Sequence, residues 1–218
     1  DVRYLEMKND QEKLYHHRWG SNNSFNAEVG MDYTWHAEQS QKNGEPGYIW
    51  LNNARTKGRF KDGDRFDDIN VAGFNPCVEQ QLEDAELCCL VETYPAKHED
   101  LEDYLRTLKI AYLYGKTITL SNTHWPETNA KMLKNRRIGL SQSGVVQAFS
   151  KFGRREVYDM CDRAYAYVKQ LDEEYSNWLC IPKSVRMTSI KPSGTVSLLN
   201  GSTPGIHFPE DEYYIRRI

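Results

Sequence analysis

Long apolar runs are missing from this chain of 218 residues. No stretch approaches the roughly 18 consecutive apolar residues that can span a bilayer, so the sequence predicts no transmembrane helix. Neither sign of charge dominates, because 28 basic and 31 acidic residues leave a net charge of −3. The chain therefore lacks the basic field of proteins that bind nucleic acid polymers, and we expect neither a membrane nor a nucleic acid as its partner.

Cysteine is scarce, and no two cysteines have the C-x-x-C spacing that is common in structural zinc sites. The five cysteines are Cys77, Cys88, Cys89, Cys161 and Cys180. An odd number of cysteines without a secretion signal is typical of a reducing compartment rather than of a disulfide scaffold. We therefore expect a cytoplasmic protein.

The sequence does contain the material for a packed core, with 39% hydrophobic and 12% aromatic residues. Such a composition argues against disorder, and the length suits one large domain or two small ones. Both ends, residues 1–5 and 213–218, read as the middle of an element. We therefore expect residues 1–218 to be a piece of a longer protein.

Segments with helical and strand patterns alternate, which predicts an α/β architecture. The clearest helix covers residues 99–114, where apolar side chains from Leu101 to Tyr112 recur every three or four positions and Gly115 is expected to end the helix. Residues 188–199 read as a strand, a glycine turn and then a strand or a helix. Further helices are predicted over about 10–18, 126–135 and 156–179, strands over 48–51, 116–120 and 213–218, a buried strand or tight turn over 138–141, and an exposed loop over 55–68.

The most informative stretch is residues 75–79, in which a cysteine lies between an amide and a carboxylate: Asn75, Cys77 and Glu79. If this segment is extended, the three side chains point to one face, because side chains alternate along a strand. Cys88 follows eleven residues after Cys77. An amide, a carboxylate and two thiols suit radical or redox chemistry on a hydroxylated substrate.

A radical reaction on a ribose needs a hydrogen-atom acceptor, a base, a group that binds the sugar hydroxyls and a pair of thiols. As a thiyl radical, Cys77 can abstract a hydrogen atom, and Glu79 can act as the base. Asn75 can bond the hydroxyls, and Cys88 can be one half of a dithiol that becomes a disulfide in each turnover. The alternative is that both cysteines are inert and buried and that Glu79 is a surface charge.

A second candidate site lies at Ser193, Gly194 and Thr195. Two hydroxyls and unhindered backbone N–H groups in such a turn can hold a phosphate through hydrogen bonds. The alternative is an ordinary turn, since this composition is common in turns.

Four stretches together resemble the ribonucleotide reductases. Residues 75–79 with 87–88 resemble the active-site finger loop of that family, residues 44–51 and 135–141 resemble strands before and after it, and residues 191–196 with 205–207 resemble the substrate-phosphate loop. The similarity covers nearly the whole chain. The spacing of the two cysteines and the sequence of residues 191–195 are most like the class II enzymes, and within them the monomeric branch that acts on ribonucleoside triphosphates.

The resemblance implies part of a ten-stranded α/β barrel with a central finger loop, so that residues 1–218 would be a fragment of the catalytic barrel domain. Cys77 would carry the thiyl radical, Glu79 and Asn75 would handle the sugar hydroxyls, and Cys88 would be one redox partner. The cofactor of the complete enzyme would be adenosylcobalamin, with no metal ligands in this chain. The partners would be a ribonucleotide substrate, as the triphosphate, and a thioredoxin-type reductant.

The sequence departs from the family pattern in three ways. Val78 stands where the family has glycine, and Cys89 stands where relatives have a polar residue. Neighbours on an extended segment point in opposite directions, so only one of Cys88 and Cys89 can face Cys77, and the spacing selects Cys88. Residues 1–76 contain no cysteine to pair with it, so we expect the fragment to be inactive without the missing parts of the same enzyme.

Two other functions remain open. The first is a piece of the large subunit of a class I ribonucleotide reductase, which takes its radical from a separate metal-containing subunit. The second is a non-catalytic nucleotide-binding piece of a split gene.

Overall fold

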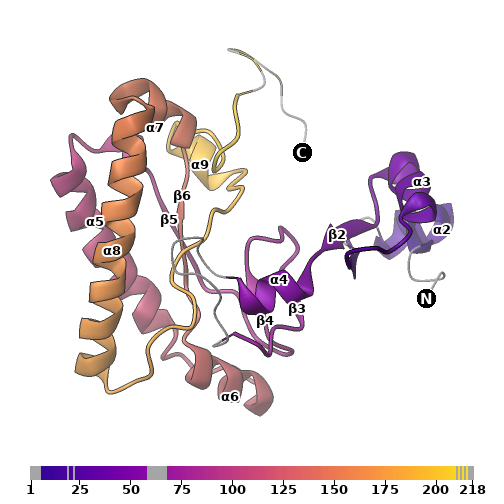
Figure 1. Cartoon of the computed structure of the whole chain (residues 1–218), viewed down its shortest axis with the longest axis horizontal. Helices are drawn as coiled ribbons and strands as arrows, with labels where there is room; N and C mark the ends of the chain where they lie inside the picture. Colours follow the sequence, from indigo (N-terminus) through magenta and orange to yellow (C-terminus); the bar gives the residue numbers. More distant parts are fainter. Residues whose placement is uncertain are drawn as a thin grey trace. The chain divides into compact units, whose positions relative to one another are not determined.

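The computed structural model describes residues 6–18, 20–21, 23–57, 68–209, 211, 213 and 215. The chain divides into two compact units, Asp1–Pro76 and Cys77–Ile218 (Figure 1). Within the described ranges, no helix combines the length and the apolarity that a membrane crossing requires. The mixed α/β class predicted from the sequence is confirmed.

The first unit is small and built around aromatic rings. Its strands β1 and β2 are parallel, and Phe25 of β1 stacks on His36 of α3 with ring centroids 4.2 Å apart and packs against Tyr48 of β2 at 4.9 Å. The elements are η1 (Met7–Asn9), α2 (Gln11–Lys13), the π-helical η2 (Leu14–Arg18), β1 (Ser24–Asn26), α3 (Thr34–Asn43), β2 (Gly47–Ile49), α4 (Leu51–Thr56) and β3 (Gly73–Phe74).

Two predicted elements of this unit differ in detail from the observed ones. The helix predicted over 10–18 is found as α2 and η2. The strand predicted over 48–51 ends at Ile49, because Leu51 already begins α4. Most of the predicted loop over 55–68 lies outside the described residues.

The second unit is a layer of parallel strands covered by helices. Strands β5 and β6 pair in parallel, from Leu90 opposite Gly139 to Thr93 opposite Gln142, and a parallel bridge between Leu140 and Thr188 adds a third segment. The elements are β4 (Gln81–Leu82), β5 (Leu90–Thr93), η4 (Pro95–Lys97), α5 (Leu101–Ile118), α6 (Pro126–Asn135), β6 (Gly139–Gln142), α7 (Val145–Phe152), α8 (Arg154–Leu179) and α9 (Val196–Leu199).

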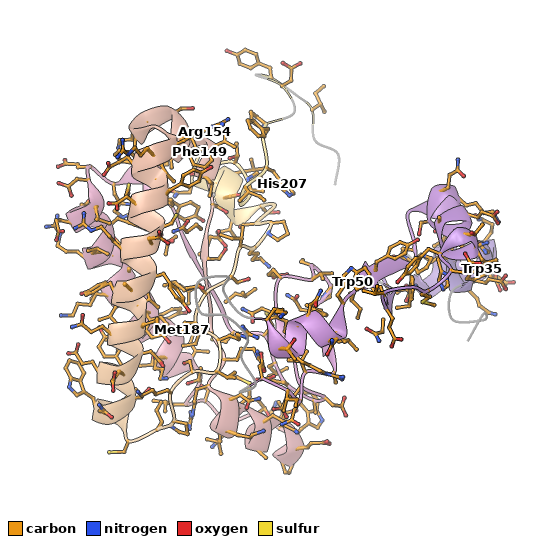
Figure 2. All side chains as sticks on the ribbon, in the orientation of Figure 1. Trp35, Trp50, Phe149, Arg154, Met187 and His207 are labelled. Atoms are coloured by element: carbon orange, nitrogen blue, oxygen red, sulfur yellow. The ribbon has the colours of Figure 1, made fainter. Side chains whose placement is uncertain are left out.

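Helices α5 and α8 run side by side and cover one face of β5 and β6 (Figure 1). Helix α5 begins where Asp100 accepts a hydrogen bond from the Asp103 backbone N–H at 2.8 Å, which is the usual N-cap arrangement. The buried side chains form one core between the helices and the strands, and Met187, labelled in Figure 2, belongs to it. The members of this core are Leu101, Tyr104, Leu108, Tyr112, Ile138, Leu140, Met160, Ala164, Val168, Leu171, Tyr175 and Met187.

The predicted end of the first long helix at Gly115, and the strand predicted over 116–120, are wrong. Helix α5 continues through Gly115 to Ile118, because Lys116 forms a buried ion pair with Asp172 at 2.6 Å. The glycine is needed for close packing rather than for a turn. A Cβ atom at position 115 would lie 3.1 Å from a Val91 methyl group and 3.2 Å from one of Ile138.

Three other predicted elements of this unit are present in the structure. Helices α6 and α8 and strand β6 are confirmed. After the glycine turn the chain forms a short helix, α9, rather than a strand. Helix α7 and strand β5 were not predicted, and the strand predicted over 213–218 lies largely outside the described residues.

Candidate functional site

The face of β5 and β6 that is turned away from the helices carries polar side chains. Along β5 the side chains alternate: the Thr93 hydroxyl contacts the Tyr104 hydroxyl of α5 at 3.0 Å, so Glu92 projects to the opposite face. Glu92 lies directly opposite Ser141 of β6 in the strand register, and the Ser141 hydroxyl donates to Glu92 Oε1 at 3.4 Å. The pairing of two strands thus places a carboxyl and a hydroxyl together.

Glu79 approaches the same group from the segment before β4. Its side chain is only 4% exposed, and Lys191 Nζ lies 3.9 Å from its Oε1 atom. Neither carboxylate oxygen has a hydrogen-bond partner among the described residues. The backbone fixes these positions, since the Ser189 hydroxyl donates to the Glu79 carbonyl at 2.8 Å and the Lys191 N–H donates to Ser141 Oγ at 2.8 Å.

We call Glu79, Glu92, Lys191, Ser141 and Ser143 the carboxyl cluster. Burial raises the pKa of Glu92, and the nearby Glu79 raises it further, against the opposing effects of Ser143, Ser141 and Lys191. The cluster therefore holds two carboxyl groups and one ammonium group in a largely buried place, where full ionisation of both carboxyls is costly.

Five buried side-chain oxygens of the second unit's described residues lack a hydrogen-bond partner: both of Glu79, Oε2 of Glu92, and the hydroxyls of Ser202 and Thr203. The segment that carries the two hydroxyls adjoins the end of β6, because the Gly144 N–H donates to the Thr203 carbonyl at 2.8 Å. Buried polar groups are nearly always hydrogen-bonded in proteins. The concentration of exceptions at the carboxyl ends of parallel strands, where α/β proteins bind their ligands, indicates a site for a polar molecule.

The predicted reactive cysteine lies in a turn and not in an extended segment. Val78 has a positive φ of 63°, and a turn covers Pro76 and Cys77. Residues 75–79 are therefore not the extended segment in which the three side chains would have pointed to one face. Cys77 is exposed, whereas Glu79 is buried. Asn75 belongs to the first unit, where it follows β3 and is half-buried.

The two adjacent cysteines have different surroundings. Cys89 is buried in the core, with its thiol 3.6 Å from the Gly115 carbonyl of α5, and burial raises its pKa. Cys88 is half-buried. Cys89 is thus held by the core, which leaves Cys88 as the more accessible of the pair. The alternative of inert, buried cysteines and a surface glutamate does not describe these residues, since Cys77 is exposed and Glu79 is buried.

The predicted phosphate turn is continuous with the carboxyl cluster along the chain. Ser193, two residues after Lys191, is 2% exposed, and its carbonyl accepts a hydrogen bond from the Ser197 hydroxyl of α9. Gly194 is half-buried and Thr195 is exposed. The structure therefore brings one end of this turn close to the buried carboxylates.

Sequence reasoning missed Glu92, Ser141, Ser143, Ser202 and Thr203 as members of the site. A signal was present for one of them, because residues 90–93 form a short strand in which a glutamate stands between valine and threonine. A charged residue in an otherwise uncharged strand is a candidate for function, whereas the serines and threonines are too common to stand out.

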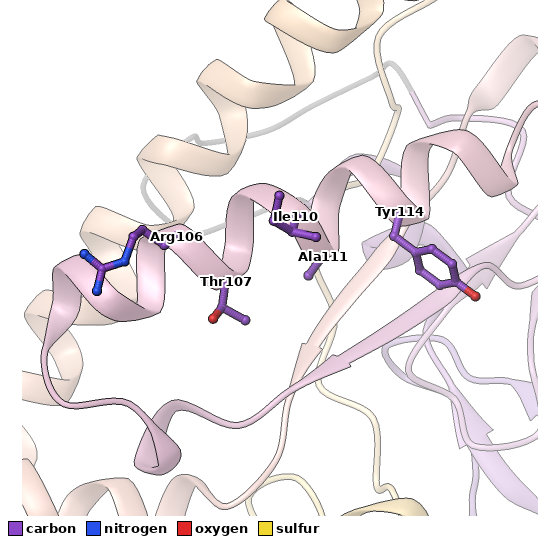
Figure 3. Close-up of a pocket in the computed structure, with 5 residues that line it drawn as sticks. All are labelled: Arg106, Thr107, Ile110, Ala111 and Tyr114. Atoms are coloured by element: carbon purple, nitrogen blue, oxygen red, sulfur yellow. The ribbon is translucent and has the colours of Figure 1, made fainter.

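A separate groove runs along the outer face of α5 (Figure 3). It is lined mainly by apolar surface from Arg106, Thr107, Ile110, Ala111 and Tyr114. Ile110 and Tyr114 are 65% and 61% exposed. With Arg106 as its one charged member among these residues, the groove lacks the acid, base and thiol groups found at the strand ends. No group of three or more His, Cys, Asp or Glu side chains suited to a metal ion occurs in the described part of the chain.

Comparison with known proteins finds close similarity to one group of enzymes. A Dictyostelium discoideum protein named a probable adenosylcobalamin-dependent ribonucleoside-triphosphate reductase is 52% identical over 218 residues, covering 99% of this chain and 29% of that protein. The adenosylcobalamin-dependent ribonucleoside-triphosphate reductases of Euglena gracilis and Lactobacillus leichmannii are 51% and 36% identical, over 92% and 100% of this chain and 27% and 33% of those proteins. No protein-family model matches the chain.

Solved structures agree. A crystal structure of a B12-dependent, class II ribonucleotide reductase superposes with a TM-score of 0.86 and 33% identity, over 95% of this chain and 33% of that one. The α subunit of a class Id ribonucleotide reductase from Actinobacillus ureae superposes with a TM-score of 0.56 at 16% identity, over 78% of this chain and 38% of that one, which shows a shared fold. The chain spans about 30% of the length of the curated relatives that it matches.

Proposed function

We propose that this chain, a homologue of part of the adenosylcobalamin-dependent (class II) ribonucleotide reductases, contributes the reaction site with which a longer protein reduces ribonucleoside triphosphates to 2′-deoxyribonucleotides. One observation of the structure carries the proposal: Glu79, a buried glutamate whose two carboxylate oxygens have no hydrogen-bond partner within the described ranges, lies two residues after an exposed thiol, Cys77. A base and a hydrogen-atom acceptor are thus available at the open end of a parallel layer.

In the proposed reaction, a thiyl radical on Cys77 takes a hydrogen atom from the ribose. Glu79 accepts the proton of the neighbouring hydroxyl, and Asn75 hydrogen-bonds the sugar hydroxyls. A thiol of the Cys88 pair protonates the 2′-hydroxyl, which leaves as water, and the pair supplies two electrons as it becomes a disulfide. The Cys77 thiol then returns its hydrogen atom to the ribose, which regenerates the thiyl radical. A thioredoxin-type reductant then restores the thiols.

The chemistry that adenosylcobalamin supplies when bound to the complete protein is a radical from homolysis of its cobalt–carbon bond. Two features of this chain fit such a source. The Cys77 thiol is exposed, so a radical that arises outside this chain's core can reach it. The Glu79 side chain, two residues further along, is only 4% exposed, so the proposed base is shielded from solvent.

The proposal extends to the substrate phosphates and to the rest of the protein. Ser193, Gly194 and Thr195 would contact the phosphates, with the ribose then lying toward the carboxyl cluster. Residues 1–218 would form part of a ten-stranded barrel domain, with residues 75–79 in its finger loop, in a cytoplasmic enzyme. The other parts of that enzyme would supply the second redox thiol.

The proposal is tested in the complete protein by replacing Cys77 with serine or alanine. We expect deoxynucleotide formation to fall below detection while ribonucleotide binding persists, since the thiol acts in the reaction and not in binding. Cys180→Ser is the matched control, because Cys180 is an exposed thiol at the end of α8 and its loss should leave turnover unchanged. Reduction by either Cys77 variant, or wild-type reduction that needs a metal-containing subunit in place of adenosylcobalamin, would contradict the proposal.

A further inference from the structure

The carboxyl cluster contains a residue to which the proposed reaction gives no role. Glu92 accepts a hydrogen bond from the Ser141 hydroxyl through its Oε1 at 3.4 Å. Its Oε2 is buried, with no hydrogen-bond partner in the part of the chain that the structure describes. It shares the cluster with Glu79, and Lys191 is the cation placed against that glutamate at 3.9 Å. The Lys191 backbone is tied to Ser141, which is the residue that contacts Glu92. Two carboxyls therefore compete for one ammonium group.

We propose that Glu92 is a positioning residue that acts on Glu79 through Lys191: an uncharged Glu92 leaves the ammonium group to Glu79, and an ionised Glu92 draws it away. The inference rests on the proposed function, in which Glu79 receives a proton from a ribose hydroxyl. The inference adds a second carboxyl group, that of Glu92, whose protonation state determines how strongly Lys191 interacts with Glu79.

The surroundings of Glu92 favour its uncharged form. Burial is the largest cause that raises its pKa, and the Glu79 carboxylate adds to it. The phenols of Tyr94, next in the chain after β5, and of Tyr104, on the helix-covered side of β5, interact electrostatically with Glu92, and the pKa of each is raised by burial, so both stay neutral. The charges that decide the state of Glu92 are therefore those of Glu79 and Lys191.

At low pH a wild-type Glu92 is uncharged and resembles glutamine. As the pH rises through its raised pKa, Glu92 ionises, competes for Lys191 and weakens the hold on Glu79. The kcat/KM of a Glu92→Gln variant, divided by that of the wild type, should therefore start near one at low pH and rise by about threefold or more, the scale of a partly exposed ion pair.

The experiment measures this ratio in the complete protein from acid to mildly alkaline pH. Glu102→Gln on α5 is the matched control, because Glu102 is 70% exposed and its ratio should not change with pH. A flat or falling ratio for Glu92→Gln would overturn the inference. If Glu92→Gln does not fold, Lys191→Met is used instead. Without the shared ammonium group, the fall in kcat/KM that the wild type shows as Glu92 ionises should disappear. Persistence of that fall in Lys191→Met would overturn the inference.

Infrared difference spectroscopy separates this inference from the proposed function, because it needs no turnover. We expect the wild type to show a protonated-carboxyl band that titrates above the ordinary range of glutamate and is missing from Glu92→Gln. Absence of that band in the wild type would overturn the inference even in an active enzyme. An inactive wild type that shows the band would refute the proposed function alone.

Discussion

Two buried polar clusters of the second unit differ in how far their groups are paired. Between α5 and α8, the Asp172 carboxylate accepts hydrogen bonds from Lys116 at 2.6 Å, from the Tyr112 hydroxyl at 2.8 Å and from the Ser184 N–H at 3.0 Å. In the carboxyl cluster, the Glu79 side chain accepts no hydrogen bond from any residue that the structure describes. One carboxylate is surrounded by donors, and the other is equally buried without them.

This difference separates a structural role from a functional one. A buried charge is tolerated when hydrogen bonds and an opposite charge compensate for the loss of water, as at Asp172. A buried carboxylate without donors costs stability, and such costs persist in native proteins mainly where a ligand or a reaction uses the group. The comparison predicts that substitutions in the paired cluster reduce stability, whereas substitutions in the carboxyl cluster reduce activity.

The largest effect on stability is expected for Lys116→Met in the complete protein. It leaves Asp172 buried without its counter-charge, which typically costs about 3–5 kcal/mol. The measurement is the shift of the urea or thermal unfolding transition. The double variant Lys116→Met/Asp172→Leu should recover most of the loss, because no unpaired charge remains. If Lys116→Met is as stable as the wild type, the paired cluster around Asp172 does not stabilise the fold, which contradicts the structural role assigned to it.

Glu79→Gln should give the opposite pattern, with a loss of turnover of about 10²- to 10⁴-fold, the usual contribution of a general base. Its unfolding transition should stay the same or move upward, because a neutral amide is less costly to bury without partners than a carboxylate. Both properties are measured on one preparation. A destabilisation as large as that of Lys116→Met would show that Glu79 serves the fold.

A smaller effect concerns Glu83, a third buried carboxylate that resembles the paired cluster. Burial acts to raise its pKa, but hydrogen bonds from Lys131, Asn135 and Lys134 outweigh burial and lower the pKa to about 2 from a reference of 4.5. A lowered pKa means that this stabilisation is complete above pH 4.5 and is lost as the pH falls toward 2.

The contribution should be about 1–3 kcal/mol, since Lys131 and Lys134 are 33% and 58% exposed and solvent screens them. Glu83→Gln should therefore be less stable than the wild type near neutral pH, and the difference should shrink in acid. Unfolding transitions of both proteins across this range measure it. A difference that does not change with pH would show that the pairing of Glu83 is not electrostatic.

The helices were predictable from the sequence because their signals are local. The apolar stripes of α5 and α8 and the proline that starts α6 act within a few residues, and they placed these helices closely. The helix end predicted at Gly115 was wrong because this glycine serves tertiary packing: it allows Val91 and Ile138 to approach α5. A local sequence pattern does not contain that information. Strand β5 was not predicted because its four residues are too few to show a clear alternation of apolar and polar side chains.

The candidate site was predictable in its residue types and less so in its shape. Cys77 and Glu79 stood out because a thiol and a carboxylate lie two residues apart, next to an amide at Asn75, and this set suits radical or redox chemistry. The shared face of the three side chains depended on an extended backbone, and the structure instead has a positive φ at Val78, where the family has glycine. Glu92 became visible only once the register of β5 and β6 placed it beside Ser141, which depends on contacts between residues far apart in the chain.

The smallest expected effect tests the backbone that carries the reactive pair. Val78 has a φ of 63°, where a β-branched residue is strained by about 1–2 kcal/mol, and its side chain is 42% exposed, so little packing depends on it. Val78→Gly should relieve the strain and, after the entropic cost of a glycine, raise the free energy of unfolding of the complete protein by about 0.5–1 kcal/mol.

Val78→Ala is the matched control, because alanine removes the same methyl groups but keeps the unfavourable positive φ. Stabilisation by glycine and not by alanine would locate the strain in the backbone, whereas equal effects would assign it to packing. Turnover in both variants should stay within about threefold of the wild type, since the thiol and the carboxylate are retained. A much larger loss with glycine alone would mean that the strained valine itself holds Cys77 over the substrate, because a strained backbone persists where the reaction requires it.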